Sequence, residues 1–430
     1  MQRCLYNTQW DSQDRRHYSS FIDALEFHMP GLFKQTLYRF RSGLTRKVLK
    51  PHAQPKPVTY IGPGSVKSLC EAIAHFGLKR IFLVTDKPLV ELGLINNAVA
   101  VLKAVGIETV IYDGVLPDPT FKLINEGLAL LKSSQCDGVL AFGGGSSMDA
   151  AKIMALAAAN NATPHDLIGY GKAKLPSLPL FAIPTTAGTG SEVTIAAVPS
   201  DDETHAKRPI ADNKMVPTAC ALDPTIMTGL PPHITSATGM DALTHAIESY
   251  IGNWGTPETE RLASAAVKLV FEHLPVAYED GSNLASREAM SLASYYAGLA
   301  FSQAMVGFVH AISHQLGAHY SIPHGLANAV VLPHVLEYSK TEAQKKMAQL
   351  MVSTGLGEAS EGEAALAQKL IDTVIELNDR VDIPRGFEQI KVGDIAEMAT
   401  AACIEGNGYP VPKYMDVEDC THILMGLIPR

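Results

Sequence analysis

The chain has 430 residues, of which 47% are hydrophobic and 18% are charged, and its formal net charge is −9. This length predicts two domains rather than a single core, and the composition excludes a largely disordered chain. The negative net charge argues against a protein that wraps nucleic acid, which needs a concentrated basic face. No stretch approaches the length of apolar sequence that spans a bilayer.

The cysteines and the amino terminus indicate a cytoplasmic protein. The six cysteines show no Cys-x-x-Cys spacing, which fits a reduced compartment better than a disulfide framework or a zinc ribbon. Residues 1–16 read MQRCLYNTQWDSQDRR and lack the apolar core of a secretory signal. We therefore expect a cytoplasmic protein whose size is typical of an enzyme.

Residues 1–57 differ from the rest of the chain. Between Pro30 and Lys50 there are six basic residues and no acidic one, and apolar residues recur at roughly helical spacing. This pattern predicts a basic amphipathic helix, followed by an extended, proline-rich linker over 50–57. Such a helix can make a peripheral contact with an anionic membrane through residues 30–50. It can equally dock on its own domain or on a neighbouring subunit.

From Val58 onward, short apolar runs alternate with helical patterns. The runs predicted to be strands are 80–87, 108–115, 136–145 and 178–186. Their alternation with helical segments such as 120–134 predicts a mainly parallel sheet covered on both faces. The strand signal ends near Pro231, and the runs predicted to be helices after it are 234–252, 258–274 and 287–317.

These patterns predict an α/β fold in three parts. Residues 1–57 form the extension and linker, 58–230 a Rossmann-like parallel-sheet domain, and 231–430 an all-helical domain. Ligands of open parallel sheets bind at the carboxyl ends of the strands. We therefore expect the active site in the cleft between the sheet domain and the helical domain.

Two pairs of metal-binding residue types have helical i, i+4 spacing. Asp241 and His245 form one pair, His310 and His314 form the other, and His324 follows shortly after. Residues four apart in a helix share one face. A carboxylate with several imidazoles suits Fe(II), Zn(II), Ni(II) or Co(II) better than magnesium or calcium. Asp and His at this spacing also often just hydrogen-bond on a surface, so spacing alone leaves both interpretations open.

Two polar loops that follow apolar strands indicate nucleotide binding. The segment GGGSSMDAAK (143–152) has three consecutive glycines before a helix, and backbone N–H groups there favour a phosphate. The segment IPTTAGTGSEVT (183–194) is rich in hydroxyl donors. Asp86 ends another strand, where a carboxylate accepts from a ribose hydroxyl and repels a 2′-phosphate. Each loop alone also fits a tight turn, but the two loops together with Asp86 favour nucleotide binding, and Asp86 predicts NAD over NADP.

Taken together, these motifs resemble the iron-containing, or group III, alcohol dehydrogenase family. The resemblance covers residues 58–430 and rests on GGGSSMDAAK, IPTTAGTGSEVT, GMDALTHAIESY, VHAISHQLGAHYSIPHG and ANAVVLPHVLEY in the family's order. The motifs look most like those of the lactaldehyde reductase and the propanediol or butanol dehydrogenase branches. The resemblance implies hydride exchange between a primary or small secondary alcohol and NAD, with Fe(II) as the Lewis acid. It also implies a homodimer.

The resemblance further implies which residues form the site. The implied metal ligands are Asp241, His245, His310 and His324. His314 is the implied catalytic residue, beside the metal, where it relays a proton. The implied cofactor contacts are Asp86, Asp118, Gly144, Gly145, Ser146, Asp149, Thr185, Thr186, Thr189 and Lys207. No ligand role falls on His319, which we expect to be a packing histidine.

The chain departs from the family pattern just before His310, where many relatives have an asparagine and a Gly-Leu-Gly stretch. We expect Gln303, Met305 and Phe308 to reshape the substrate pocket there. The sequence around Lys207 also differs slightly from the pattern.

Two other functions are compatible with parts of the pattern. A dehydroquinate-synthase-like lyase would need several cationic residues around the metal to hold an acidic substrate, and the ligand-bearing helices carry almost none. A non-catalytic, membrane-associated scaffold would predict damaged ligand positions, and all of them are intact. Within the family, His245 argues against the glycerol-dehydrogenase-like members, which typically lack it.

Overall fold

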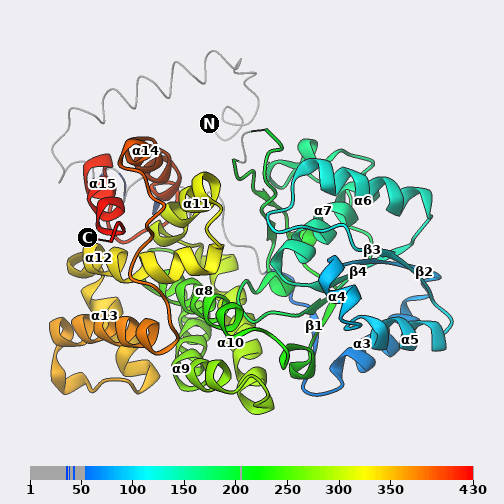
Figure 1. The fold of residues 1–430 in the computed structure, drawn as a ribbon, viewed down its shortest axis with the longest axis horizontal. Coiled ribbons are helices and arrows are strands. Elements are labelled where there is room, and N and C mark those ends of the chain that lie inside the picture. Colours follow the sequence, from blue (N-terminus) through cyan, green and yellow to red (C-terminus); the bar gives the residue numbers. More distant parts are fainter. Residues whose placement is uncertain (1–34, 37, 39–41, 44–53, 204–205, 430) are drawn as a thin grey trace. The chain divides into compact units, whose positions relative to one another are not determined.

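A six-stranded parallel sheet precedes a set of helices in the computed structural model (Figure 1), which describes residues 35–36, 38, 42–43, 54–203 and 206–429. The strands, in their order across the sheet, are β1 (Val58–Ile61), β9 (Ala219–Leu222), β6 (Leu180–Pro184), β4 (Gly138–Gly143), β2 (Arg80–Val84) and β3 (Glu108–Tyr112). Four of them match the predicted strands. The sequence analysis missed β1 and β9, and also a small sheet of β5 (Gly169–Tyr170), β8 (Ile210–Ala211) and β7 (Ala196–Ala197).

Helices cover both faces of the sheet because successive strand residues point to opposite sides. Val139 and Ala141 of β4 belong to a core with α6 (Phe121–Ser133) and α7 (Gly145–Asn160). Leu140 of the same strand belongs to a second core, with α3 (Ser65–Ile73) and α5 (Asn96–Ala104). The parallel sheet with two covered faces is therefore confirmed.

The carboxyl ends of three neighbouring strands bring the predicted cofactor segments together. β4 pairs with β2 on one side and with β6 on the other, with Gly143 opposite Pro184. From β2 the chain crosses to β3 on one side, whereas β4 and β6 lie on the other side of β2. Such a change of direction is where open parallel sheets bind nucleotides. Asp86, which follows β2, and the two polar loops all lie at this edge.

The second half of the chain is helical, as predicted. Its helices are α8 (Pro232–Ile251), α9 (Pro257–Glu279), α10 (Leu284–Ala304), α11 (Phe308–Tyr320), α12 (His324–Thr354), α13 (Glu363–Arg380), α14 (Ile395–Gly406) and α15 (Val417–Gly426). Among residues 223–429 there is no strand. The predicted domain limits at 57 and 230 stay predictions, although the second lies between β9 and α8.

The prediction of one continuous helix over 287–317 is wrong. The chain breaks at 305–307 between α10 and α11, and the two helices are bent by 104°. Met305 ends α10 with a φ of 66°, a left-handed conformation that a non-glycine residue seldom adopts. The break lies at Val306 and Gly307, which have lower helix propensity than Ala304 and Met305 before them.

The predicted amphipathic helix over 30–50 lies largely outside the described residues. Only 35–36, 38 and 42–43 of that range are described, and these are helical. Residues 1–50 and 51–430 form separate units. In the part of the chain that the structure covers, no single helix is long and apolar enough to cross a membrane, and only the bent pair α10–α11 reaches that length and composition together.

Glycines let the loop after β6 touch the helical half at the backbone. A Cβ on Gly190, whose φ is +59°, would lie 2.7 Å from the Cα atom of Gly298 in α10. A Cβ on Gly188 would lie 2.8 Å from the carbonyl oxygen of Thr238 in α8. The predicted cofactor loop is therefore seated directly on two helices that follow the sheet domain in the chain.

We expect Gly298→Ala to destabilise the protein. Its Cβ would meet the carbonyl oxygen of Gly190 at 2.9 Å and the Val193 Cγ2 atom at 2.7 Å. Overpacking of this kind costs about 1–3 kcal/mol. Thermal unfolding of the variant should therefore begin at a lower temperature than that of the wild-type protein. Gly229→Ala is the matched control because its Cβ would meet nothing within 4 Å, and equal midpoints for both variants would contradict the close contact.

Candidate active site

Side chains from three helices converge on one point. Ligand atoms of Asp241 and His245 on α8 and of His310 on α11 all lie within 4.8 Å of one another. The Nε2 atom of His324, at the start of α12, lies 3.6 Å from the same Asp241 oxygen. A Cβ on Gly325 would lie 2.3 Å from the carbonyl oxygen of Ala237, so glycine lets α12 begin close enough to α8 for His324 to arrive. The structure thus assembles the four predicted metal ligands.

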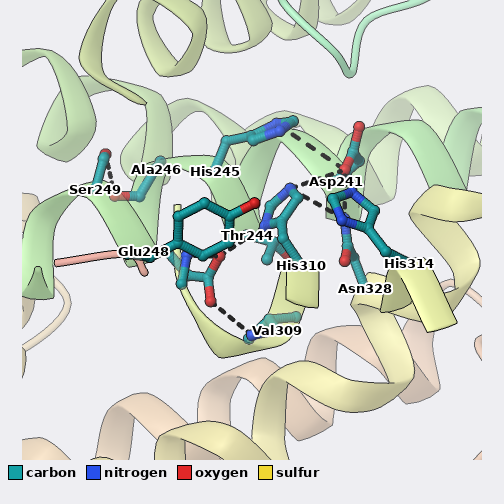
Figure 2. A network of polar contacts seen from close by, with 12 residues as sticks. Asp241, Thr244, His245, Ala246, Glu248, Ser249, Val309, His310, His314 and Asn328 are labelled. Atoms are coloured by element: carbon teal, nitrogen blue, oxygen red, sulfur yellow. Dashed lines mark hydrogen bonds and ion pairs between the residues drawn. The ribbon is translucent and has the colours of Figure 1, made fainter. Parts of the chain in front are cut away.

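The amide group of Asn328 contacts three of the four predicted ligands, and Figure 2 shows it beside Asp241. The Nδ2 atom of Asn328 lies 2.7 Å from Asp241 Oδ1, 3.3 Å from His310 Nε2 and 3.1 Å from His324 Nε2. Three acceptors that share one donor form a pocket whose polarity favours a cation. The buried Nδ1 atom of His245 has no hydrogen-bond partner among the described residues. One carboxylate with three imidazoles is also the donor set that suits iron and its neighbours in the first transition series.

The histidines of this cluster are held neutral. Burial lowers the pKa of His245, although Asp241 and the backbone of Gly188 oppose the change. Burial, reinforced by the neighbouring histidines, lowers the pKa of His310 well below its usual value. Burial likewise lowers the pKa of His324 to about 4. Neutral imidazole is the form that binds metals, so the three rings are in the ligating state near neutral pH.

A buried carboxyl group contacts the His310 ring on the side that faces away from the other ligands. Glu248, one turn after His245 on α8, lies with its Oε2 atom 2.6 Å from His310 Nδ1. It also accepts hydrogen bonds from two backbone N–H groups at the start of α11, those of Gly307 (2.8 Å) and Val309 (2.7 Å). Figure 2 shows the contact with Val309. Burial raises the pKa of Glu248 to about 8, against the effect of these donors. A carboxylate on the far nitrogen of a ligating histidine fixes the orientation of the ring.

The implied catalytic histidine lies beside the cluster. The His314 ring stacks on that of His324 with centroids 5.3 Å apart and planes at 19°. Its Nδ1 atom lies 2.6 Å from Glu405 Oε1 on α14. Burial alone would raise the pKa of Glu405, but His314 and the hydroxyl of Tyr409 outweigh it and lower this pKa. His319, by contrast, is exposed with its Nδ1 atom 3.0 Å from the Gln315 carbonyl, so the expectation of a packing histidine is wrong.

The two predicted phosphate-binding loops, which follow β4 and β6, are in contact with each other. A Cβ on Gly145 would lie 2.7 Å from the Cγ2 atom of Thr189, and one on Gly144 would lie 3.4 Å from Thr186 Oγ1. The backbone N–H of Thr185 donates to the carbonyl of Gly143 at 3.0 Å, which joins the two loops where they leave their strands. Helix α7 starts at Gly145, so the N–H groups of its first turn lie where these loops meet. The structure thus brings Gly144, Gly145, Ser146, Thr185, Thr186 and Thr189 together.

Asp149 and a buried lysine bind these loops to each other. Asp149 accepts from Ser191 Oγ at 2.8 Å and from the Val198 N–H at 2.9 Å. Lys152 is 1% exposed, and its ammonium group donates to Ser191 and Thr194. Burial lowers the pKa of Lys152 to about 8, against the attraction of Asp149. Both oxygens of Asp149 have partners in the protein, and its role as a cofactor contact stays a prediction.

The remaining predicted cofactor residues lie on either side of the loops. Asp86 is the N-cap of α4 (Lys87–Glu91) and accepts from the Leu89 N–H at 3.0 Å through Oδ1. Burial raises the pKa of Asp86, and that hydrogen bond opposes the change. Lys207 forms an ion pair with Asp118 at 2.6 Å. Its charge contributes to the lowered pKa of His324, so this pair lies within electrostatic range of the metal ligands.

The comparisons with known proteins agree with this arrangement. The model described as "Iron-containing alcohol dehydrogenase" matches residues 56–224, and that of the C-terminal part of the Fe-containing alcohol dehydrogenase family matches residues 235–427. The NAD-dependent methanol dehydrogenase of Bacillus methanolicus is 36% identical over 374 residues, which are 86% of this chain and 97% of the relative.

The chain belongs to the iron-containing alcohol dehydrogenase family. A 1,3-propanediol dehydrogenase of Klebsiella pneumoniae is 38% identical to it over 362 residues, which cover 83% of this chain and 93% of the relative. The crystal structure of a 1,3-propanediol oxidoreductase superposes with a TM-score of 0.84 at 35% identity, covering 88% of this chain and all of that one. The chain is therefore an alcohol dehydrogenase or aldehyde reductase by class, and the lyase and scaffold alternatives are not favoured.

In this member of the family, the residues that support the site were not found from the sequence. Glu248 and Asn328 lie within the motifs GMDALTHAIESY and ANAVVLPHVLEY but received no role there, and Glu405 lies outside the motifs. The partners of the two glutamates lie 62 and 91 residues away in the chain. One signal was available for Glu248, because it follows Asp241 and His245 on the same helical face. Phe308, expected in the substrate pocket, is 1% exposed and would be met by a Cβ on Gly406 at 2.2 Å, so it packs against α14.

We expect His310→Ala to lose the bound metal. The substitution removes a ligand from the centre of the cluster, so turnover should fall by more than about 100-fold. Elemental analysis of anaerobically purified protein measures the metal directly. His319→Ala is the matched control, since it removes an exposed histidine from the same helix. Full metal content and full turnover in His310→Ala would show that the ligand assignment is incorrect.

Proposed function

We propose that the protein is an NAD-dependent, iron-dependent enzyme that interconverts primary or small secondary alcohols and their aldehydes or ketones. The observation that carries this proposal is the convergence of Asp241, His245, His310 and His324 next to a loop with the geometry of a nucleotide site. A divalent iron held by these residues supplies Lewis acidity toward the alcohol or carbonyl oxygen. Zinc, nickel or cobalt can be held by the same donor set.

The residues around the metal ligands divide the remaining tasks. His314 lies beside the ligands without belonging to them, and it takes the proton that leaves the alcohol. The hydride chemistry belongs to the nicotinamide cofactor, and the glycine and threonine loops hold its phosphates. Contacts of Gly188 with α8 and of Gly190 with α10 place that loop against the ligand-bearing helices.

The preference for NAD over NADP rests on Asp86. The carboxylate lies at the carboxyl end of β2, beside the change of direction in the sheet. There it repels a 2′-phosphate and accepts from a 2′-hydroxyl. NADP remains the less favoured cofactor.

Three further features complete the proposal. β1 is an edge strand of the sheet, with Val58 and Ile61 62% and 51% exposed. Its outer edge pairs with no strand among the described residues, and such an edge supports a homodimer. Five cysteines in the described part of the chain are free thiols, which supports a cytoplasmic location. The six basic residues between Pro30 and Lys50, without an acidic one, support a peripheral membrane contact.

The experiment that tests the proposal follows oxidation of NADH by a panel of short and medium-chain aldehydes. The protein is purified without oxygen and its metal content is measured in the same sample. We expect NADH to be consumed, and we expect activity to disappear with a chelator and return with Fe(II). Failure of every aldehyde and every alcohol, with metal bound, would contradict the proposed reaction.

We expect Asp86→Asn to raise the use of NADP relative to NAD by about tenfold, because it removes a like charge from the 2′-phosphate. Asparagine caps a helix as well as aspartate does, so α4 should keep its start. The ratio of kcat/KM for the two cofactors measures the effect. Glu91→Gln, which removes an exposed carboxylate from the same helix, should leave that ratio unchanged. An unchanged ratio in Asp86→Asn would exclude Asp86 as the source of the preference.

A further inference from the structure

Glu405, Tyr409 and Gln315 form a hydrogen-bonded group next to the His314 ring. Glu405, near the end of α14, lies with Oε1 2.6 Å from His314 Nδ1. The hydroxyl of Tyr409, four residues later, donates to the same Oε1 at 2.7 Å. Gln315 donates to the other oxygen, Oε2, at 3.5 Å. The side chains of His314 and Glu405 are 14% and 27% exposed, so this chain of contacts is largely shielded from water.

These contacts decide which nitrogen of His314 carries the proton. An ionised carboxylate only accepts hydrogen bonds, whereas a neutral imidazole has one donor and one acceptor nitrogen. With Nδ1 facing Glu405, Nδ1 is the donor and Nε2 is the nitrogen with the free electron pair. Tyr409 strengthens this arrangement because a second donor on the same oxygen favours the ionised carboxylate. Burial, together with Glu405, raises the pKa of Tyr409 well above its usual value, so its hydroxyl remains a donor.

The ring held in this way lies beside the metal ligands but is oriented by a different element. The His314 centroid is 5.3 Å from that of His324 and 6.2 Å from that of His310. Its orienting partner comes from α14, whereas the partner of His310 comes from α8. The two histidines of α11 are therefore fixed independently, and a change at Glu405 need not disturb the metal ligands.

We propose that Glu405 is a positioning residue for the proton step: it holds His314 with the proton on Nδ1, so that Nε2 accepts the proton of the alcohol. The inference rests on the proposed function. In alcohol oxidation the O–H bond breaks and its proton moves to Nε2, while a hydride leaves the carbinol carbon for C4 of NAD. The alcohol is oxidised to the carbonyl compound, NAD is reduced to NADH, and the imidazolium then passes its extra proton to solvent.

The first test is spectroscopic and needs neither metal nor turnover. Nitrogen chemical shifts of selectively labelled histidines, recorded on the metal-free full-length protein, report which ring nitrogen bears hydrogen. His314→Ala assigns the signal. We expect the Nδ1–H form in the wild-type protein and in Glu397→Gln, which removes an exposed carboxylate from the same helix. We expect a mixture of both forms in Glu405→Leu. An Nε2–H form in the wild-type protein would overturn the proposal.

The second test is kinetic. Glu405→Gln, which keeps the size of the side chain but not its charge, and Glu405→Leu should each lower kcat by about 10- to 100-fold. The metal content and the KM for NAD should stay at wild-type values. In the His314→Ala background, Glu405→Leu should cause no further loss, because it acts only through that ring. An equal loss in both backgrounds would overturn the proposal. A wild-type enzyme with no alcohol or aldehyde turnover would instead contradict the proposed function, and the spectroscopic result would still stand.

Discussion

The cluster of predicted metal ligands on α8, α11 and α12 depends on one buried carboxyl group, that of Glu248. Glu248 is 5% exposed, and a buried carboxyl group without hydrogen-bond partners costs about 1–3 kcal/mol. Here it has three donors: His310 and the N–H groups of Gly307 and Val309. Those N–H groups belong to the first turn of α11, which has no helical partners of its own for them. The same side chain therefore stabilises the start of α11 and orients the His310 ring.

This arrangement explains why the glycine at 307 matters and why the break lies where it does. A Cβ there would lie 2.7 Å from Glu248 Oε1, so a larger residue would displace the carboxylate from the start of α11. The left-handed Met305 just before it turns the chain. A conformation of that kind persists only where its surroundings impose it. Glu248 accepts hydrogen bonds from Gly307 and Val309 and so holds the backbone just after Met305.

The predicted cofactor loop after β6 is joined to the helices of the second half of the chain by close contacts at two glycines. Gly190 approaches the backbone of α10, and Gly188 approaches the Cβ atom and the carbonyl oxygen of Thr238 in α8. Lys152 binds the far end of the same loop to α7. The loop is thus fixed at both ends by atoms that have few alternative positions. The separation between the phosphate-binding segments and the ligands is consequently set by packing, which holds reacting groups more accurately than a flexible connection does.

Local patterns carried most of what the sequence could predict. The pair Asp241 and His245 is readable because helical spacing places both on one face, and the glycine loop is readable because it follows a buried strand. β1 and β9 have only four residues each, too few to show a period. Glu248 lies within the motif GMDALTHAIESY and Glu405 lies outside the motifs, but neither role could be assigned, because each depends on a partner brought close only by the fold. The break at Met305 was not predicted from the sequence for the same reason, because the side chain that contacts the residues after it, Glu248, lies on α8.

The two histidines of α11 show that a hydrogen-bonded carboxylate does not by itself decide the role of an imidazole. Both His310 and His314 have Nδ1 2.6 Å from a glutamate oxygen, and both therefore present Nε2 on the other side of the ring. The two rings differ in what surrounds Nε2. The Nε2 atom of His310 lies 3.9 Å from the Asp241 carboxylate, and both side chains are 3% exposed. An electron pair in these surroundings favours binding a cation. His314, one turn later and 14% exposed, stacks outside the ligand set, where the same electron pair is available to a proton. In the proposed mechanism one helix turn thus separates a metal ligand from a base, and the glutamates on α8 and α14 orient the two rings.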